Sequence, residues 1–223
     1  MTALEVFYPA DLVDGPWVLL LEQACKLIDN LKEHSGVADP FWTLGGGTVL
    51  MFRYRHRRSK DIDIFVPDPQ YLGYVNPRLS DVAAEVSQDY VEAAGYVKLI
   101  RADGEIDFVA SRNLTQTPFE WWRLGGRDIR VETAAEIVAK KLWHRGHVAS
   151  ARDVFDLSLV IDKHRAELDT AARYLIRHRD SFIRQLHDRQ SILKAQFEAI
   201  DTLDYQPSFE QARQSCEKFL SDL

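Results

Sequence analysis

Two stretches of the chain alternate acidic and apolar side chains, Asp61–Phe65 (DIDIF) and Glu105–Val109 (EIDFV). A period of two residues predicts a β-strand with one polar and one buried face. In the first strand Asp61 and Asp63 share the polar face, and the two isoleucines beside them anchor the other face in the core. Part of the fold must therefore be a sheet that carries carboxylates on one face.

The carboxylates of these two strands could form one site. If the strands are neighbours, Asp107 joins Asp61 and Asp63, and such close carboxylates need protons, basic partners or a divalent cation. Oxygen ligands of this kind suit Mg²⁺ or Mn²⁺, and three of them can hold two cations about 3.5–4 Å apart. A register shifted by two residues would bring Glu105 there instead. The alternative is a solvated strand face whose acids pair with arginines, with Asp107 as a surface acid at a hairpin end.

A triple glycine and a threonine, Gly45–Thr48, separate an expected strand over 41–44 from a helix expected from about Thr48. Glycines let a phosphate approach the backbone closely, and the amides of a helix N-terminus form an anion site. Thr48 could cap this helix and also donate its hydroxyl to a phosphate oxygen. The spacing matches neither a P-loop nor a dinucleotide-binding fingerprint, so a plain strand-to-helix turn is the alternative.

A basic run lies between this turn and the first pair of aspartates. Its members are Arg53, Arg55, His56, Arg57, Arg58 and Lys60. A charge run is usually a solvated face, which is our interpretation for Arg53 and Arg55. Arg57, Arg58 and Lys60 could instead neutralise a triphosphate or attract an RNA backbone. For His56 the sequence leaves open a packing or orienting group and a general base.

The front of the chain mixes helices and strands. Apolar residues at helical spacing predict helices over 17–31 and over about 82–91. The runs 96–101 and 105–110 are separated by a turn containing Asp-Gly, which predicts a β-hairpin. A short strand is expected over 129–131.

The back of the chain is predicted to be helical. From Thr133 onward helix-forming segments follow one another, and Thr133 with Glu136 has the spacing of a helix N-cap. A break is expected near Gln206-Pro207. The predicted organisation is therefore an α+β fold with an α/β core over 1–131 and an α-helical domain over 132–223.

The composition narrows the functional class. A net charge of −6 and a pI near 5.7 argue against a general nucleic-acid coat protein, although not against a local basic patch. Cys25 and Cys216 lack metal-type spacing, so we expect neither a zinc site nor a disulfide scaffold but two thiols in a reducing cytoplasm. No N-terminal signal and no run of about 18 apolar residues is present, which predicts a soluble cytoplasmic protein without a membrane partner.

Several of these motifs occur in an order that resembles the nucleotidyltransferases of the polymerase-β-like superfamily, and most of all the AbiEii/AbiGii-type toxin family. The similarity covers the Gly-Gly-Thr turn at 46–48, the His-Arg-Arg-Ser to Asp-Ile-Asp segment at 56–63, and 106–108. Two later blocks, 135–142 and 152–157, are similar to the family's lysine and Arg-Asp-x-x-Asp-Leu motifs. The resemblance implies a polymerase-β-like nucleotidyltransferase core, a mixed sheet flanked by helices, followed by a C-terminal α-helical region.

The resemblance also implies a reaction and an active site. The enzyme would transfer a nucleoside monophosphate from an NTP to an acceptor hydroxyl and release pyrophosphate, with Mg²⁺ (or Mn²⁺) as cofactor. Asp61, Asp63 and Asp107 would bind the metals, and Asp107 would also assist deprotonation of the acceptor. The nucleotide-binding residues would be Gly46, Gly47, Thr48, Arg58, Ser59 and Lys60.

The later blocks would supply further site residues. Lys141 would contact the nucleotide or its phosphates, and Asp153 would orient Lys141 or the substrate, although Lys140 could be the functional lysine instead. Asp156 is expected to be structural, held through Arg152 or a backbone group. Read without the family, such single charged residues are ordinary surface groups.

The partners implied by the resemblance are an NTP, a cognate antitoxin protein and, in some relatives, the 3′ end of tRNA as acceptor, in a toxin–antitoxin system that serves phage defence. One alternative is the same chemistry on a small molecule, as in antibiotic-modifying enzymes, or on a protein. The second is a non-catalytic module that keeps the fold and binds RNA or a partner.

Overall fold

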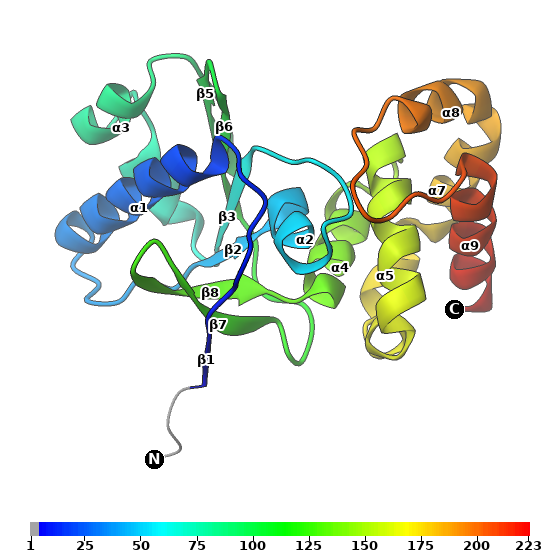
Figure 1. Ribbon diagram of the computed structural model, residues 1–223. Coiled ribbons are helices and arrows are strands. Elements are labelled where there is room, and N and C mark those ends of the chain that lie inside the picture. The colour runs from blue at the N-terminus through cyan, green and yellow to red at the C-terminus, as the bar shows by residue number, and fades with distance from the viewer. Residues whose placement is uncertain (1–4) are drawn as a thin grey trace. The chain divides into compact units, whose positions relative to one another are not determined.

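In the computed structural model, which describes residues 5–223, the chain forms two compact units (Figure 1). The first unit comprises Met1–Phe52, Ser59–Asn113 and Phe119–Glu132, and the second comprises Arg53–Arg58, Leu114–Pro118 and Thr133–Leu223. Two short segments of the second unit thus lie, in sequence, between parts of the first.

The front of the chain contains all strands of the sheet. Its elements are β1 (Val6–Phe7), α1 (Trp17–His34), β2 (Thr43–Gly45), α2 (Gly46–Tyr54), β3 (Ile62–Val66), the 3₁₀ helix η1 (Pro69–Val75), α3 (Asp81–Val86), β4 (Tyr90–Ala93), β5 (Tyr96–Arg101), β6 (Gly104–Ala110), β7 (Phe119–Leu124) and β8 (Arg127–Glu132). The strands form one mixed sheet in the order β1-β7-β8-β2-β3-β6-β5-β4. The β3–β6 pair at its centre is parallel.

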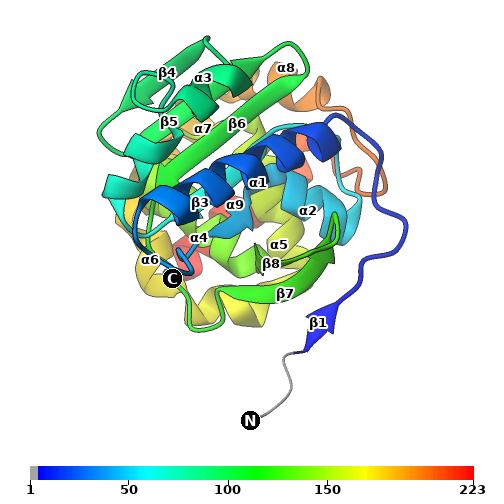
Figure 2. The same cartoon turned by 90° about the vertical axis from the view of Figure 1, so that its left-hand side faces the viewer.

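Helix α1 covers one face of this sheet. It contacts β3 and β6, and Figure 2 shows it lying across the sheet. Leu20, Leu27 and Leu31 on its inner face are fully buried. The helix predicted over 17–31 is confirmed, and its apolar stripe provides the packing that fixes the helix to the central strands.

The structure corrects the helix predicted over 82–91. Helix α3 ends at Val86, because Ser87 takes an extended conformation and its hydroxyl donates to the carbonyl oxygen of Ile100 at 2.6 Å. The residues that follow form β4, the edge strand paired antiparallel with β5. Pairing with a strand overrode the helical spacing of the apolar residues.

The hairpin and the last strand agree with the sequence pattern. Strands β5 and β6 pair antiparallel around a turn at Ala102 and Asp103. The strand expected at 129–131 is part of β8, which pairs with β7, a strand that the sequence pattern did not predict. Together they extend the sheet beyond its carboxylate-bearing centre.

The second unit is helical, as predicted. Its elements are α4 (Ala134–Arg145), α5 (Ala151–Thr170), α6 (Ala172–Leu175), the 3₁₀ helix η2 (Ile176–His178), α7 (Arg179–Asp188), α8 (Gln190–Glu198) and α9 (Phe209–Asp222). Helix α5 contacts α4, α8 and α9. Its buried Phe155 packs against the rings of Phe197 and Tyr205, both at 5.3 Å between centroids.

Two details of this unit follow from capping and loop pairing. The hydroxyl of Thr133 accepts from the Glu136 amide, which confirms the predicted N-cap of α4. The predicted break near Gln206-Pro207 lies in the loop between α8 and α9, and backbone hydrogen bonds tie this loop to the segment 53–58. The basic segment is therefore held by the helical unit through main-chain bonds as well as side chains.

Candidate active site

The central strands place Asp63 and Asp107 next to each other. In the parallel β3–β6 pair the register sets Asp63 opposite Asp107, while Ile62 and Ile106 form a fully buried pair on the other face. The strands predicted to carry the carboxylates are thus confirmed as neighbours, and the alternative register with Glu105 opposite Asp63 is excluded. The sheet itself supplies the alignment of the two acids.

The carboxylate of Asp107 is only partly neutralised. Its Oδ2 lies 3.2 Å from Nζ of Lys98, whereas its buried Oδ1 has no hydrogen-bond partner among the described residues. Burial, and after it the negative charge of Asp63, raises the pKa of Asp107 to about 6, against the opposing effect of Lys98. A half-buried carboxylate whose buried oxygen lacks a partner among the described residues, next to a second acid, would be stabilised by a bound cation.

Lys98 is a residue of this site that sequence reasoning missed. It lies on β5 directly opposite Asp107 and forms ion pairs with Glu105 and Asp107. Burial acts to lower the pKa of Lys98, but its hydrogen bond to Glu105 and the charge of Asp107 raise it above the usual value. Counting residues back from the hairpin turn would have placed Lys98 beside Asp107, so the signal was present in the sequence.

The glycine turn lies directly against Asp63. Gly46 has a φ of +76°, and a Cβ at this position would lie 1.8 Å from Oδ2 of Asp63. A Cβ at Gly45 would lie 2.3 Å from Oε2 of Glu132. The glycines are needed because carboxylates fill the space that side chains would take, and the turn is held next to the Asp63–Asp107 pair.

Thr48 has a different place from the predicted one. The helix expected from about Thr48 is present as α2, but it begins at Gly46, so Thr48 lies inside the first turn and the prediction that Thr48 caps the helix is wrong. The hydroxyl is fully buried, donates to the carbonyl oxygen of Asp61 at 2.6 Å and lies 3.0 Å from Oγ of Ser59. It therefore ties the glycine turn to the segment that enters β3. Ser59 is half-buried and Lys60 is exposed.

Asp61 has a backbone partner in this structure. It precedes β3, and its Oδ1 accepts from the amide of Glu105 at 3.0 Å. Within residues 5–223 no group of three or more His, Cys, Asp or Glu side chains is arranged to hold a metal ion. Asp63 and Asp107 do fit a divalent cation, because they offer hard oxygen donors and Oδ1 of Asp107 has no partner among the described residues.

In the second unit Asp156 is the centre of a buried ion-pair network. Its carboxylate accepts from Nε and Nη2 of Arg57, each at 2.8 Å, and from Nζ of Lys141 at 2.5 Å, while Nε2 of His56 lies 2.9 Å away. Although burial favours the neutral acid, Arg57 and Lys141 hold the pKa of Asp156 well below its usual value. The structure thus supports a structural Asp156 but corrects its partner, since Arg152 is exposed.

This network decides between alternatives for the basic run. Arg57 is 3% exposed and forms a bidentate pair with Asp156, so its expected role toward a triphosphate is wrong. Burial is the main reason that the pKa of His56 is lowered, and its ring packs against Phe155. His56 therefore orients and packs. Arg55 and Arg58 are exposed, and Arg58 lies 3.4 Å from Asp201.

The two candidate lysines have different surroundings. Nζ of Lys141 lies 3.3 Å from Oδ1 of Asp153, which also pairs with Arg145 at 2.7 Å. Burial acts to raise the pKa of Asp153, but Lys141 and Arg145 hold it below the usual value. Lys140 is 3% exposed and pairs with Glu136 at 3.4 Å. The predicted contact with Asp153 is therefore made by Lys141 and not by Lys140.

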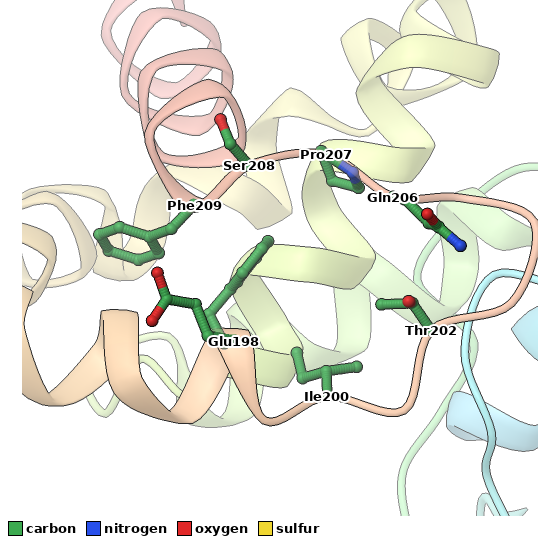
Figure 3. A pocket seen from close by; sticks show the side chains of 8 residues that line it. Glu198, Ile200, Thr202, Gln206, Pro207, Ser208 and Phe209 are labelled. Atoms are coloured by element: carbon green, nitrogen blue, oxygen red, sulfur yellow. The ribbon is translucent and has the colours of Figure 1, made fainter.

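A shallow pocket also lies in the second unit, between the end of α8 and the start of α9 (Figure 3). It is lined by Phe197, Glu198, Ile200, Thr202, Gln206, Pro207, Ser208 and Phe209. Glu198 is the charged side chain of this set, and the set includes no residue that the sequence predicted for the site. The pocket is therefore distinct from the predicted site residues.

Comparison with known families identifies the chain. Residues 31–221 match the family described as nucleotidyl transferase AbiEii toxin, type IV TA system. The chain belongs to the AbiEii family. It is accordingly a nucleotidyltransferase toxin of a type IV toxin–antitoxin system, and the family and activity expected from its motifs are confirmed. No curated protein matches the chain.

Two solved structures are similar to this chain, and the first supports the fold. A crystal structure of an H. pylori protein assigned as a nucleotidyltransferase is 16% identical, with a TM-score of 0.51, over 94% of this chain and 95% of that one. A second structure, JHP933 from Helicobacter pylori, is 15% identical with a TM-score of 0.48, over 94% of this chain and 92% of that one. With the family match, the first confirms the predicted fold class, a nucleotidyltransferase core with a helical C-terminal region.

The family also bears on partners. A type IV toxin–antitoxin family implies a cognate antitoxin, and nucleotidyltransferases use NTP substrates and generally a divalent metal. In the part of the chain that the structure describes, no helix has the length and apolar character needed to cross a bilayer.

Proposed function

We propose that this AbiEii-family toxin transfers a nucleoside monophosphate from an NTP to a tRNA hydroxyl in a reaction that depends on Mg²⁺. The observation that carries the metal dependence is the Asp63–Asp107 pair, aligned by the β3–β6 register and set against the glycine turn. The tRNA acceptor rests on the resemblance to relatives that modify tRNA. A role in phage defence and a cytoplasmic location belong to the same proposal, as does the division into domains 1–131 and 132–223.

The first unit would provide the metal site and part of the phosphate site. Asp63 and Asp107 would hold Mg²⁺, and Asp61 would join them. When bound, the cation would neutralise charge on the phosphates and promote ionisation of the attacking hydroxyl. The backbone of Gly46 and Gly47 would approach the phosphates, and Thr48 would keep this turn in place through Asp61. Ser59 and Lys60 would complete the nucleotide contacts.

The family resemblance assigns the remaining groups of the proposal. Lys141 would bind phosphate, and Asp153, which already contacts its ammonium, would orient it. Arg58 would contribute a further positive charge. Asp156 is a positioning residue in this scheme, because it contacts Lys141 and Arg57 and is itself completely buried.

The proposed reaction is an in-line substitution at the α-phosphorus. The acceptor oxygen forms a bond to that phosphorus, the bond to the bridging oxygen of pyrophosphate breaks, and pyrophosphate leaves. Asp107 would assist removal of the proton from the acceptor hydroxyl, as the family resemblance implies. Alignment of the reactants and charge neutralisation would provide most of the acceleration.

The test is nucleotide transfer with defined acceptors. The protein is incubated with each of four labelled NTPs and Mg²⁺, in parallel with tRNA, total cell protein and aminoglycosides. We expect label in tRNA, loss of label on chelation of the metal, and loss in Asp63→Asn.

The same assay separates the alternatives. Label only in protein or in the small-molecule fraction would replace the tRNA proposal by another acceptor. Equal labelling by Asp63→Asn would show that this carboxylate is outside the site. Absence of transfer together with absence of Mg²⁺-dependent NTP binding would favour a non-catalytic binding module.

A further inference from the structure

Basic and aromatic side chains are concentrated on the second unit, where α4 packs against α6 and η2. The sequence segments 142–152 and 171–179 contain no acidic residue, in a chain of net charge −6. The side chains that come together there are Trp143, Arg145, His147, Arg173, Tyr174, Arg177 and His178, which we call the arginine–aromatic patch. Such a concentration of positive groups in an acidic protein points to an anionic partner.

The patch is organised by stacking. The guanidinium of Arg177 lies 4.4 Å from the ring centroid of Trp143, and Trp143 meets Tyr174 edge-on at 5.7 Å. Arg173 in turn lies 4.6 Å from the ring centroid of Tyr174. The result is a continuous row of two cations and two aromatic rings. Stacking holds each guanidinium plane in place while leaving N–H groups at its edge for hydrogen bonds.

The two arginines of this row keep their charge available. Arg173 donates to the hydroxyl of Tyr174 and Arg177 to the carbonyl oxygen of Trp143, and both side chains are exposed. Neither forms an ion pair with any residue of the described range 5–223. Exposed arginines without an acidic partner are the groups from which phosphate binding releases counterions.

Two histidines and one further arginine complete the patch. The imidazoles of His147 and His178 lie 5.0 Å apart beside Arg177. Partial burial, and after it the charge of Arg177, lowers the pKa of His178. Arg145 is 55% exposed although it also contacts Asp153. Asp180 lies at the edge of the patch, where it pairs with Arg179.

From this geometry we infer that the arginine–aromatic patch binds a single-stranded polynucleotide. Backbone phosphates pair with Arg173, Arg177 and Arg145, and unpaired bases stack on the exposed parts of Trp143 and Tyr174. A row with two adjacent rings and an arginine at each end fits this ligand, because single-strand binders combine positive groups for the phosphates with aromatic rings on which bases stack. An acidic protein segment would use the arginines but would not need the rings. The inference does not depend on nucleotide transfer by this protein.

Direct binding tests the inference without catalysis. Fluorescent RNA and DNA strands of about 15 nucleotides, a length within known site sizes for single-strand binders, are titrated with the full chain without NTP or Mg²⁺, and anisotropy is recorded. We expect binding that weakens with salt. Replacing both Arg173 and Arg177 by Gln should weaken it by roughly tenfold or more and reduce the slope of log K against log salt by about 1.4, the value for two lost phosphate contacts. Tyr174→Leu should weaken binding with little change in this slope.

Arg165→Gln is the matched control. Arg165 also stacks on an aromatic ring, Phe219 at 4.4 Å, but it pairs with Asp169 and lies on α5, so its replacement should leave binding unchanged. Equal loss in Arg165→Gln and in the double variant would overturn the inference, as would binding to neither RNA nor DNA. Undiminished binding by Tyr174→Leu would refute the stacking and indicate a purely ionic surface. Strand binding without nucleotide transfer would leave the patch standing and refute the proposed function alone.

Discussion

The two units differ in the partners that they give to an aspartate carboxylate. In the first unit Asp107 keeps one oxygen without a partner among the described residues, faces a second acid, and has a raised pKa. In the second unit Asp156 is surrounded by Arg57, His56 and Lys141, and its pKa is lowered. An aspartate of the first unit thus has an oxygen without a partner among the described residues, whereas an aspartate of the second unit has three partners.

The difference separates groups that bind ligands from groups that hold the fold. A buried carboxylate whose partners are all present in the protein holds a conformation and has no free oxygen to offer a metal ion. A buried carboxylate that lacks a partner lowers the stability of the fold, and binding of a cation or a proton restores that stability. The presence or absence of hydrogen-bond and ion-pair partners, rather than burial alone, distinguishes the candidate metal ligands of this toxin from its structural acids.

The largest effect should come from breaking the network in the second unit. Asp156→Ala leaves the buried guanidinium of Arg57 without its anion, so the free energy of unfolding should fall by about 3–5 kcal/mol. Denaturant unfolding followed by circular dichroism measures it. Asp204→Ala removes an exposed pair with Arg55 and should cost less than about 1 kcal/mol. Comparable losses in the two variants would contradict the structural role assigned to Asp156.

In the first unit the corresponding change should spare the fold. Asp107→Asn removes a proposed metal ligand and base, and transfer should fall by about a hundred- to a thousandfold, or ~3–4 kcal/mol. The free energy of unfolding in metal-free buffer should stay equal or rise, because the repulsion between Asp63 and Asp107 is gone. Rates of labelled NMP transfer and denaturant midpoints give the two values. A variant that loses both activity and stability would make Asp107 a structural acid.

A smaller effect isolates the contact between the glycine turn and Asp63. Gly46→Ala and Gly36→Ala place a Cβ at nearly equal φ angles, +76° and +73°, but only the first meets a carboxylate; nothing lies within 4 Å of the second. Both variants should be destabilised by an alanine in the left-handed region. In Gly46→Ala the free energy of unfolding should fall by a further ~1–3 kcal/mol, because the new Cβ overlaps Asp63. Equal thermal and denaturant stability of the two variants would show that the turn or Asp63 moves enough to accept the Cβ without further loss of stability.

Acid should affect the second unit through its network. The folded-state pKa values of His56, Asp153 and Asp156 are all lowered, so the unfolded chain binds more protons as the pH falls. Stability should be lost first below about 6.5, the ordinary value for His56, and then below about 3.8, the ordinary value for the aspartates. Each group contributes at most about 1.4 kcal/mol per pH unit in its window. Below about pH 3.8, denaturant midpoints should decline less steeply in Asp156→Asn, and parallel curves in that window would refute the assignment.

The sequence anticipated those parts of the fold that depend on local pattern. The alternating stretches became β3 and β6, the helical stripe became α1, and Thr133 caps α4. The two acidic strands could be predicted as neighbours because each has one apolar face that must be buried in a sheet. Local rules were sufficient here because propensity, pattern and capping agreed.

What the sequence did not reveal depended on pairing between distant residues. The helix predicted to 91 gave way to β4 because β5 offered it a partner. Arg57 looked like a phosphate ligand until Asp156, 99 residues away, proved to bind it. The third carboxylate, Asp61, accepts from the amide of Glu105, and no pattern in the sequence could show that contact.

The long interval between Arg57 and Asp156 has a consequence for synthesis of the toxin. At translation rates of about 5–20 residues per second, Arg57 waits several seconds on the ribosome before its partner is made. Until then the basic segment 53–58 has neither its anion nor the α8–α9 loop that pairs with its backbone. A nascent or truncated chain would therefore present this segment to chaperones and proteases, so the cell has a window to remove the toxin before its second unit closes.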